Sequence, residues 1–306
     1  MGRARWDPTH WRGYSASTVG KSRAHIFRSR TMAPEFDPAR ITLRESRDSA
    51  PNPNSTAIIA ALDVTGSMGM LAETLARKGL GTLFSEILDR KPVSDPHVMA
   101  MAVGDAVYDR APLQVSQFEA DIRIAEQLSR LYLEGGGGGN RCESYNLPWY
   151  FAAMKTSIDC FEKRGKKGYL FTIGDEEPPE VLRAAHIREF LGDVAQGDLS
   201  SADVLAMAER LYHVFHVVVE EGHYASVHLD EVMSKWTNLL GQRVLRLSDH
   251  SKLAEVIVSA IQVNEGADAD SVSHSWSGAT SLVVANAIGG LTKSGGAAAT
   301  GGLVRF

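Results

Sequence analysis

An apolar run near residue 60 ends in an acid and two hydroxyl residues. Asp63, Thr65 and Ser67 follow the residues 58–62, with one position between each of the three. In an extended or turning backbone, side chains two positions apart point the same way, so one carboxylate and two hydroxyl oxygens can converge. Hard oxygen ligands of this kind suit Mg²⁺ or Mn²⁺, and Ca²⁺ shares the preference for oxygen. The motif therefore predicts a divalent metal site.

Two later segments carry groups that could complete such a site. A run of glycines ends at Asn140, and Glu143 and Ser144 follow shortly after it with further side-chain oxygens. Asp175 follows the apolar run 169–173 with one glycine between them. Ligands of an open parallel sheet collect where the carboxyl ends of several strands meet. We therefore expect these two loops to lie beside the first motif.

Strand-like and helical patterns alternate along most of the chain. This alternation predicts an α/β fold, a doubly wound and mostly parallel sheet with helices on both faces. The most β-branched run, 212–219, is expected to be a central strand. The strands are expected at 57–62, 97–103, 169–173, 212–219 and 243–247, and another before residue 118. The helices are expected from about 70 and at 122–133, 147–161, 181–190, 202–211, 229–240 and 253–263.

Composition divides the chain into three parts: a basic arm and linker at 1–56, a domain at 57–265, and a tail rich in Gly, Ala and Ser at 266–306. The first thirty residues carry seven Lys and Arg against a single acid, with aromatic residues between them. Such an arm could meet nucleic acid or an acidic protein surface, or fold over its own acidic body. In the tail the strand and helix patterns fade, which is typical of a flexible segment or one draped over the domain.

The whole chain has 306 residues, a formal net charge of -5 and two cysteines, Cys142 and Cys160. Two cysteines are too few for a disulfide framework, and their spacing does not suit zinc. No run approaches the roughly 18 apolar residues that span a bilayer, and the N-terminus lacks the apolar core of a signal peptide. We therefore expect a cytoplasmic protein with no membrane contact.

The three loops together resemble the metal-ion-dependent adhesion site of the von Willebrand factor A domain. That site is written Asp-x-Ser-x-Ser, with a threonine on a second, glycine-bearing loop and an aspartate after a later strand. The resemblance covers about residues 57–263, with Thr65 in place of the first serine and Asp175 in the place of the late aspartate.

The second loop departs from the family pattern, because no threonine follows the glycines. Asn140, Glu143 or Ser144 could fill that place, and Ser144 is the closest in chemistry. The metal ligands that the resemblance implies are therefore Asp63, Thr65, Ser67, Ser144 and Asp175.

The resemblance also implies a function. Mg²⁺ in such a site keeps an open position, which a carboxylate from a partner protein can complete. The implied activity is binding without catalysis. Intracellular members of the family often act beside AAA+ ATPases or in multi-protein assemblies, so a partner of that kind is expected. Contact with nucleic acid would involve only the basic arm.

Three alternatives remain for the first motif. Its acid and hydroxyls could simply cap the following helix. The residues from Thr65 to Gly69 also come close to the Gly-x-Ser-x-Gly elbow of α/β serine hydrolases, with Ser67 as nucleophile and His223, His228 or His250 as base. That fold needs several strands before the elbow, whereas the sequence before residue 57 is mostly polar. In a metal-dependent phosphohydrolase Asp63 would be the nucleophile, but such sites usually carry a second acid where Thr65 stands.

Other conspicuous residues have structural interpretations. His213 and His216 lie three apart in a predicted strand, so they face opposite sides and are expected to pack rather than to bind metal. Trp236 is expected in the core. Arg164 and its lysine neighbours, and also the acids at 175–177, could be solvated turns.

Overall fold

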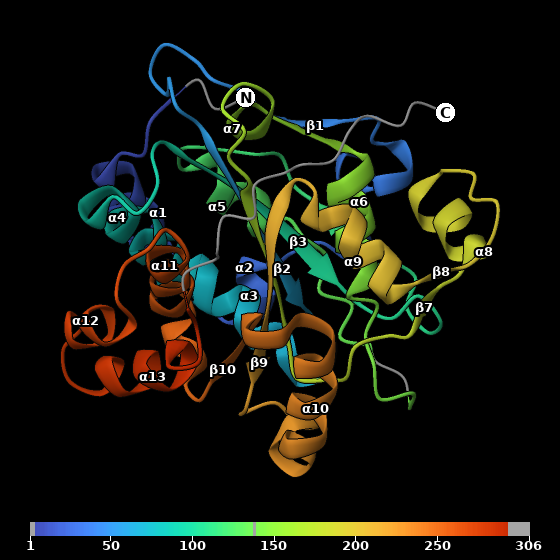
Figure 1. Ribbon diagram of the computed structural model, residues 1–306. Coiled ribbons are helices and arrows are strands. Elements are labelled where there is room, and N and C mark those ends of the chain that lie inside the picture. The colour runs from blue at the N-terminus through green and yellow to red at the C-terminus, as the bar shows by residue number, and fades with distance from the viewer. Residues whose placement is uncertain (1–3, 137–138, 293–306) are drawn as a thin grey trace.

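A six-stranded sheet forms the centre of the computed structural model, which describes residues 4–136 and 139–292 (Figure 1). The order across the sheet is β10-β9-β6-β2-β3-β4; all neighbours are parallel except β4, which runs antiparallel to β3. The predicted doubly wound α/β fold is confirmed. The strands are β2 (Thr56–Asp63), β3 (Pro96–Val103), β4 (Leu113–Val115), β6 (Gly168–Gly174), β9 (Tyr212–Val219) and β10 (Val244–Leu247).

The chain reverses its direction across the sheet between β4 and β6. From β2 it moves outward to β3 and β4, then returns to the other side of β2 and moves outward again through β9 and β10. Such a reversal opens a crevice beyond the carboxyl ends of the two central strands, where ligands of doubly wound sheets bind. Leu62 pairs with Ile173 across these strands, so Asp63 and Gly174 come next on each side.

Helices cover both faces of the sheet because β2 is apolar on both of its sides. Ile58 and Leu62 belong to one buried cluster, and Ile59 and Ala61 to the other. Figure 1 shows the two layers of helices. The first face is covered by α3 (Gly69–Thr74), α4 (Leu80–Arg90), α5 (Arg123–Leu128) and α11 (Leu253–Asn264), and the second by α6 (Asn146–Met154), α9 (Ser201–Glu209) and α10 (Ala225–Leu240).

Two expected helices are broken up. The helix expected at 147–161 ends at Met154, and β5 (Thr156–Ile158) and the short α7 (Asp159–Glu162) follow. A strand forms there because β1 (Arg44–Ser46) supplies a parallel partner, a tertiary contact that local pattern does not reveal. The stretch 181–190 begins as β7 (Val181–Leu182), which pairs with β8 (Leu199–Ser200); α8 (Ala184–His186) and a π turn (Ile187–Leu191) lie between them.

The N-terminal arm, residues 4–56 in the described structure, packs against the body of the domain. The ring of Trp6 stacks on Phe84, with centroids 4.3 Å apart. In α1 (Pro8–Thr18), the Ser15 hydroxyl donates to the Arg77 carbonyl at 3.0 Å. The arm is thus folded over the body of its own domain, one of the two roles considered for it. The next helix, α2 (Arg23–Ile26), packs on the same face of the sheet, with Ile26 in the core.

The segment after residue 266 is likewise more ordered than its composition predicts. α12 (Ala269–His274) and α13 (Ala279–Ile288) pack against α11, with Val284 and Ile288 fully buried. Helical periodicity is hard to see in α13 because small and apolar residues surround its axis on nearly all sides. Residues 293–306 of the expected tail lie outside the described residues. Within the described ranges, no helix has the length and apolar character needed to cross a membrane.

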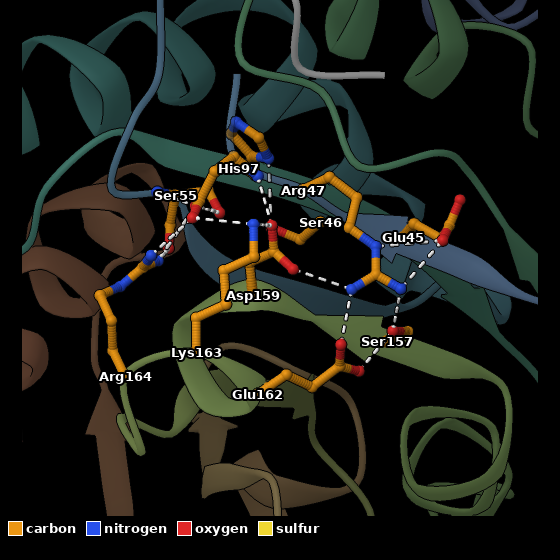
Figure 2. Close-up of polar contacts among 11 residues, drawn as sticks. Glu45, Ser46, Arg47, Ser55, His97, Ser157, Asp159, Glu162, Lys163 and Arg164 are labelled. Atoms are coloured by element: carbon orange, nitrogen blue, oxygen red, sulfur yellow. Dashed lines mark hydrogen bonds and ion pairs between the residues drawn. The ribbon is translucent and has the colours of Figure 1, made fainter. Parts of the chain in front are cut away.

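A network of ion pairs joins the arm to the amino end of the sheet (Figure 2). We call it the clasp; its acids are Asp48, Asp159 and Glu162, and its cations are Arg47, Lys163 and Arg164. Asp159 lies 2.8 Å from Arg47 and 2.6 Å from Lys163, and Asp48 lies 2.7 Å from Arg164. The prediction of a solvated turn is therefore wrong for Arg164, because its guanidinium pairs with Asp48 in the linker before β2.

The acids of the clasp are held in their charged form. Burial by itself would raise the pKa of Asp48 and of Asp159, but hydrogen bonds from Arg164 and from Lys163, respectively, lower both pKa values. The pKa of Glu162 is lowered by hydrogen bonds from Ser157 and Arg47. The chain thus supplies the countercharge for each acid of this network.

Candidate metal site

Asp63 ends β2 and is completely buried. Its Oδ1 accepts hydrogen bonds from the backbone N–H of Thr65 at 2.8 Å and from the Thr65 hydroxyl at 2.6 Å. Its Oδ2 accepts a hydrogen bond from the Tyr145 hydroxyl at 3.0 Å. Tyr145 reaches this position because residue 174 is glycine: a Cβ there would lie 1.9 Å from the Tyr145 hydroxyl oxygen. Nothing in the local sequence pointed to Tyr145, which is 82 positions from Asp63.

The first motif turns directly into a helix. Gly66–Met68 form a 3₁₀ turn, and α3 begins at Gly69. Ser67 lies in this turn, and its side chain is outside what the structure describes. Thr65 donates its proton to Asp63, which leaves the lone pairs of its oxygen available to a cation.

Asp175 lies directly after β6 and is 4% exposed, so it is not part of a solvated turn. Its Oδ2 accepts the backbone N–H of Tyr224 at 2.8 Å, at the N-terminal end of α10. The loop that brings Tyr224 there needs a glycine at position 222, because a Cβ would lie 2.2 Å from the Cβ of Asp175. The late aspartate is therefore fixed in place by the start of the following helix.

Thr65 and Asp175 line one cavity of about 460 Å³ at the crevice between β2 and β6. We call it the acidic pocket. Asp63 lies behind Thr65, from which it accepts two hydrogen bonds, and does not itself line the cavity. The other side chains that line it include Glu143, Glu176, Arg141, His223 and Tyr224.

The segment 139–144 is a wall between this pocket and a larger cavity of about 930 Å³. Gly139, Arg141 and Glu143 line the acidic pocket, whereas Asn140, Cys142 and Ser144 line the larger cavity. The segment lies beside residue 177, with Cys142 and Glu177 forming a parallel bridge, and its odd-numbered and even-numbered residues line opposite cavities.

This alternation corrects the expected ligand from the glycine loop. Ser144 lies on the far side of the wall, where its hydroxyl oxygen accepts the N–H of Ala106 at 2.9 Å. Asn140 also points away, donating to Asp105 at 2.6 Å. Of the three candidates, Glu143 alone lines the acidic pocket. One position along this segment decides which cavity a residue lines, and chemical similarity to threonine could not reveal this.

Burial raises the pKa of each acid of the pocket, and for all but Asp175 the charge of acidic neighbours raises it further, so that the protonated, neutral forms are favoured. Burial and then Asp175 raise the pKa of Asp63 to about 7. Burial, followed by Asp63, raises the pKa of Glu143 to about 10 and that of Glu176 to about 8. Burial also raises the pKa of Asp175. Within the described residues none of these four carboxylates forms an ion pair, whereas the acids of the clasp do.

The donor set fits a divalent cation. Glu143 is 1% exposed, and its Oε2 has no hydrogen-bond partner in the described structure; the same holds for the buried Oε2 of Glu176. A buried carboxylate oxygen without a donor is costly, and a cation in the pocket would satisfy it. The pocket's acids are not close enough to form a tight three-ligand cluster within the described residues.

A tighter group lies beyond the ends of β9 and β10, where Glu221, Asp249 and His250 bring their ligand atoms within 4.8 Å of one another. His250 Nδ1 lies 2.7 Å from Glu221, and Asp249 accepts the N–H of Ser251, so each of the three already has a polar partner. The group is exposed or half-buried.

The remaining histidine and tryptophan predictions concern packing, and the structure confirms them. The ring of His216 stacks on Trp236 with centroids 3.5 Å apart, and His213 faces Tyr169 on the other side of β9. Both His216 and Trp236 are fully buried. Trp236 also donates its indole N–H to the carbonyl of Glu176 at 2.8 Å, which fixes the backbone of Glu176 beside the acidic pocket.

Neither the models of protein families nor the curated protein sequences match this chain. Among solved structures, the chain is similar to the pilus adhesin SpaC from Lactobacillus rhamnosus GG, with 8% identity and a TM-score of 0.45, over 72% of this chain and 32% of that one. It is similar to a von Willebrand factor type A protein from Catenulispora acidiphila, with 15% identity and a TM-score of 0.38, over 70% and 44%. It is also similar to proximal thread matrix protein 1 from the mussel byssus, with 10% identity and a TM-score of 0.43, over 68% and 47%.

The chain spans about a third to a half of the length of these proteins. Identities and scores of this size carry no argument about function. The fold class rests instead on the strand order and on the helices that cover both faces of the sheet.

Proposed function

We propose that this chain is a divalent-metal-dependent protein-interaction module that resembles the von Willebrand factor A domain and does not catalyse a reaction. The observation that carries the proposal is the acidic pocket. Buried Asp63 and Asp175 meet at the crevice between the central strands, beside a Glu143 oxygen without a hydrogen-bond donor. Uncompensated carboxylates at this place in a doubly wound sheet are what a bound cation would require.

Asp63, Thr65, Ser67 and Asp175 would hold the ion, with Glu143 in place of Ser144. Mg²⁺ is the proposed ion, and Mn²⁺ and Ca²⁺ share its preference for oxygen ligands. The metal supplies a positive charge with an open position for an oxygen ligand. Because Glu143 adds a negative charge where the family carries a hydroxyl, the site would bind its metal more tightly and act as a weaker electrophile.

The partner that this site would take is a protein that presents a carboxylate. A partner among AAA+ ATPases or in a multi-protein assembly, and a place in the cytoplasm, are parts of the proposal that rest on the resemblance alone. Any role of the basic arm in nucleic-acid binding is restricted by its packing, since Trp6 is buried against Phe84.

Thermal unfolding with and without Mg²⁺ tests the proposal. Metal at about 100 times its Kd stabilises a folded protein by about 2.7 kcal/mol. For a chain of this size that corresponds to a rise in Tm of about 4 °C. We expect this rise for the wild type and none for Asp63→Asn, which keeps the size of the side chain but removes its charge.

Asp249→Asn is the matched control, because it removes one acid from the other cluster. It should retain the full response to Mg²⁺. A response that disappears in Asp249→Asn and persists in Asp63→Asn would move the site to the ends of β9 and β10. An unchanged wild-type midpoint with Mg²⁺, Mn²⁺ and Ca²⁺ would contradict the proposal.

The serine-hydrolase alternative gains no support from the topology. In the described part of the chain, β2 is the first strand of the large sheet, and β1 belongs to a separate pair with β5. A nucleophile elbow would need strands of the same sheet before it. Labelling of Ser67 by a fluorophosphonate probe would revive this alternative.

A further inference from the structure

Arg141 has an unusual backbone conformation at the mouth of the acidic pocket. Its φ is +66°, in the left-handed region that residues with a side chain seldom adopt. The conformation is held from behind, because the carbonyl of Arg141 accepts the N–H of Glu177 at 3.1 Å. Strain of this kind persists where the surrounding structure fixes it and is concentrated at functional sites.

The strained position directs a positive charge at a pocket that otherwise collects negative ones. Arg141 lines the pocket and is exposed, whereas Glu143 and Asp175 are buried in it. Within residues 4–136 and 139–292, the guanidinium forms no hydrogen bond and no ion pair. Its charge affects Tyr224, directly before α10, and Glu231, nearly two turns into that helix.

The pocket therefore has layers of charge. Carboxylates lie at its floor, and a guanidinium with an exposed histidine, His223, lies at its rim. A cation fits against the floor, and an anion fits between that cation and the rim. Neither charge alone satisfies both layers.

We propose that Arg141 is a specificity-determining residue that binds the carboxylate of an Asp or Glu side chain on the partner protein, one oxygen of which faces the metal. This inference rests on the proposed function. A guanidinium offers paired N–H donors that match a carboxylate. Arg141 would thereby restore part of the attraction for anions that the additional charge of Glu143 removes.

The binding experiment uses the full chain and a peptide library with random flanks around one fixed central residue. In one arm the central residue is Asp or Glu, and in the other it is Asn or Gln. Retention on immobilised protein is measured in Mg²⁺ and in EDTA. We expect the wild type to retain the acidic arm over the amide arm in Mg²⁺ only.

Arg141→Gln should reduce the affinity for the retained acidic peptides about tenfold, the size expected for loss of a charge-assisted hydrogen bond. Its thermal response to Mg²⁺ should be as large as that of the wild type, or larger, because a positive charge has been removed near the ion. Arg183→Gln is the matched control: Arg183 lines the larger cavity on the other side of the wall, so peptide affinity should be unchanged.

Arg141→Gly separates binding from folding. Glycine adopts a φ of +66° without a Cβ penalty, so this variant should fold at least as well as Arg141→Gln while losing peptide affinity to the same extent. Equal retention of acidic and amide peptides by a wild type that responds to Mg²⁺ would overturn the role of Arg141 alone. Full peptide affinity in Arg141→Gln would do the same. A wild type without any response to divalent metal would instead overturn the proposed function itself.

Discussion

The two ends of the sheet gather carboxylates in opposite ways. At the amino end, the clasp gives Asp48, Asp159 and Glu162 cationic partners, and their pKa values are lowered. At the carboxyl end, Asp63 and Glu143 form no ion pair within the described residues, and their pKa values rise to about 7 and about 10. Burial opposes charge at both ends, so the difference lies in the countercharge.

Under the proposed function, this difference separates acids that complete the fold from acids that bind a metal ion. The clasp joins β1, α7 and the linker before β2, which are far apart in the sequence. The acidic pocket joins three loops whose charges repel. Such repulsion at the crevice of the sheet is the reason for proposing a cation there.

The largest expected effect is on the pH dependence of the metal-free protein. The folded pKa of Asp63, about 7, lies above its unfolded value of 3.8. Between these values the unfolded state binds fewer protons, so stability falls as pH rises. Three pKa units correspond to about 4 kcal/mol, an upper bound for one group. In urea unfolding with EDTA at about pH 5 and about pH 8, Asp63→Asn should gain stability over the wild type as pH rises. The same change in the free energy of unfolding with pH in both proteins would contradict the contrast between the two ends of the sheet.

The next effect is expected in the clasp. Asp159→Asn should lower the free energy of unfolding by about 2 kcal/mol near neutral pH, because Arg47 and Lys163 lose their charged acceptor. The folded pKa of Asp159 is lowered, so its contribution is present above the unfolded pKa and is lost as pH falls through the folded one. Urea unfolding measures both. The same substitution at Asp63 should leave the metal-free protein as stable as the wild type or more so, and equal losses at the two sites would contradict the distinction.

A smaller effect separates the two faces of the wall. Glu143→Gln should weaken Mg²⁺ binding about tenfold in isothermal titration calorimetry, the equivalent of about 1.4 kcal/mol. Ser144→Ala should leave Mg²⁺ affinity unchanged and lose about 1 kcal/mol of stability, because Ala106 loses its acceptor. Weaker Mg²⁺ binding by Ser144→Ala, with unchanged binding by Glu143→Gln, would show that Ser144 is the ligand.

The smallest effect is expected at the exposed edge of the clasp. The side chain of Glu162 is 46% exposed, whereas that of Asp159 is 2% exposed. Water screens the pair between Glu162 and Arg47, so Glu162→Gln should cost less than about 1 kcal/mol. Urea unfolding at low and high salt checks this, since the contribution of Glu162 should shrink with salt. A loss as large as that of Asp159→Asn would show that exposure does not rank the acids of the clasp.

The short-range pattern of apolar residues predicts the strands of the central sheet well. The strand expected at 212–219 has those bounds, and the strand expected at 57–62 extends by one residue at each end. The expected helices failed where a distant segment supplied a partner, as at β5, which pairs with β1 from the arm. The arm itself was set apart by its charge, although its aromatic residues pack in the core.

The sequence by itself determined the alternation of strands and helices and the placement of Asp63, Thr65 and Asp175 at the ends of buried strands, because these depend on short-range apolar patterns. Only the tertiary structure decided which residue of the glycine loop joins them. The direction of a side chain there depends on the bridge between Cys142 and Glu177, formed by segments more than thirty positions apart. It also decided that the carboxylates of the clasp would be neutralised by the chain's own cations and those of the acidic pocket would not, since countercharge depends on which distant segments meet.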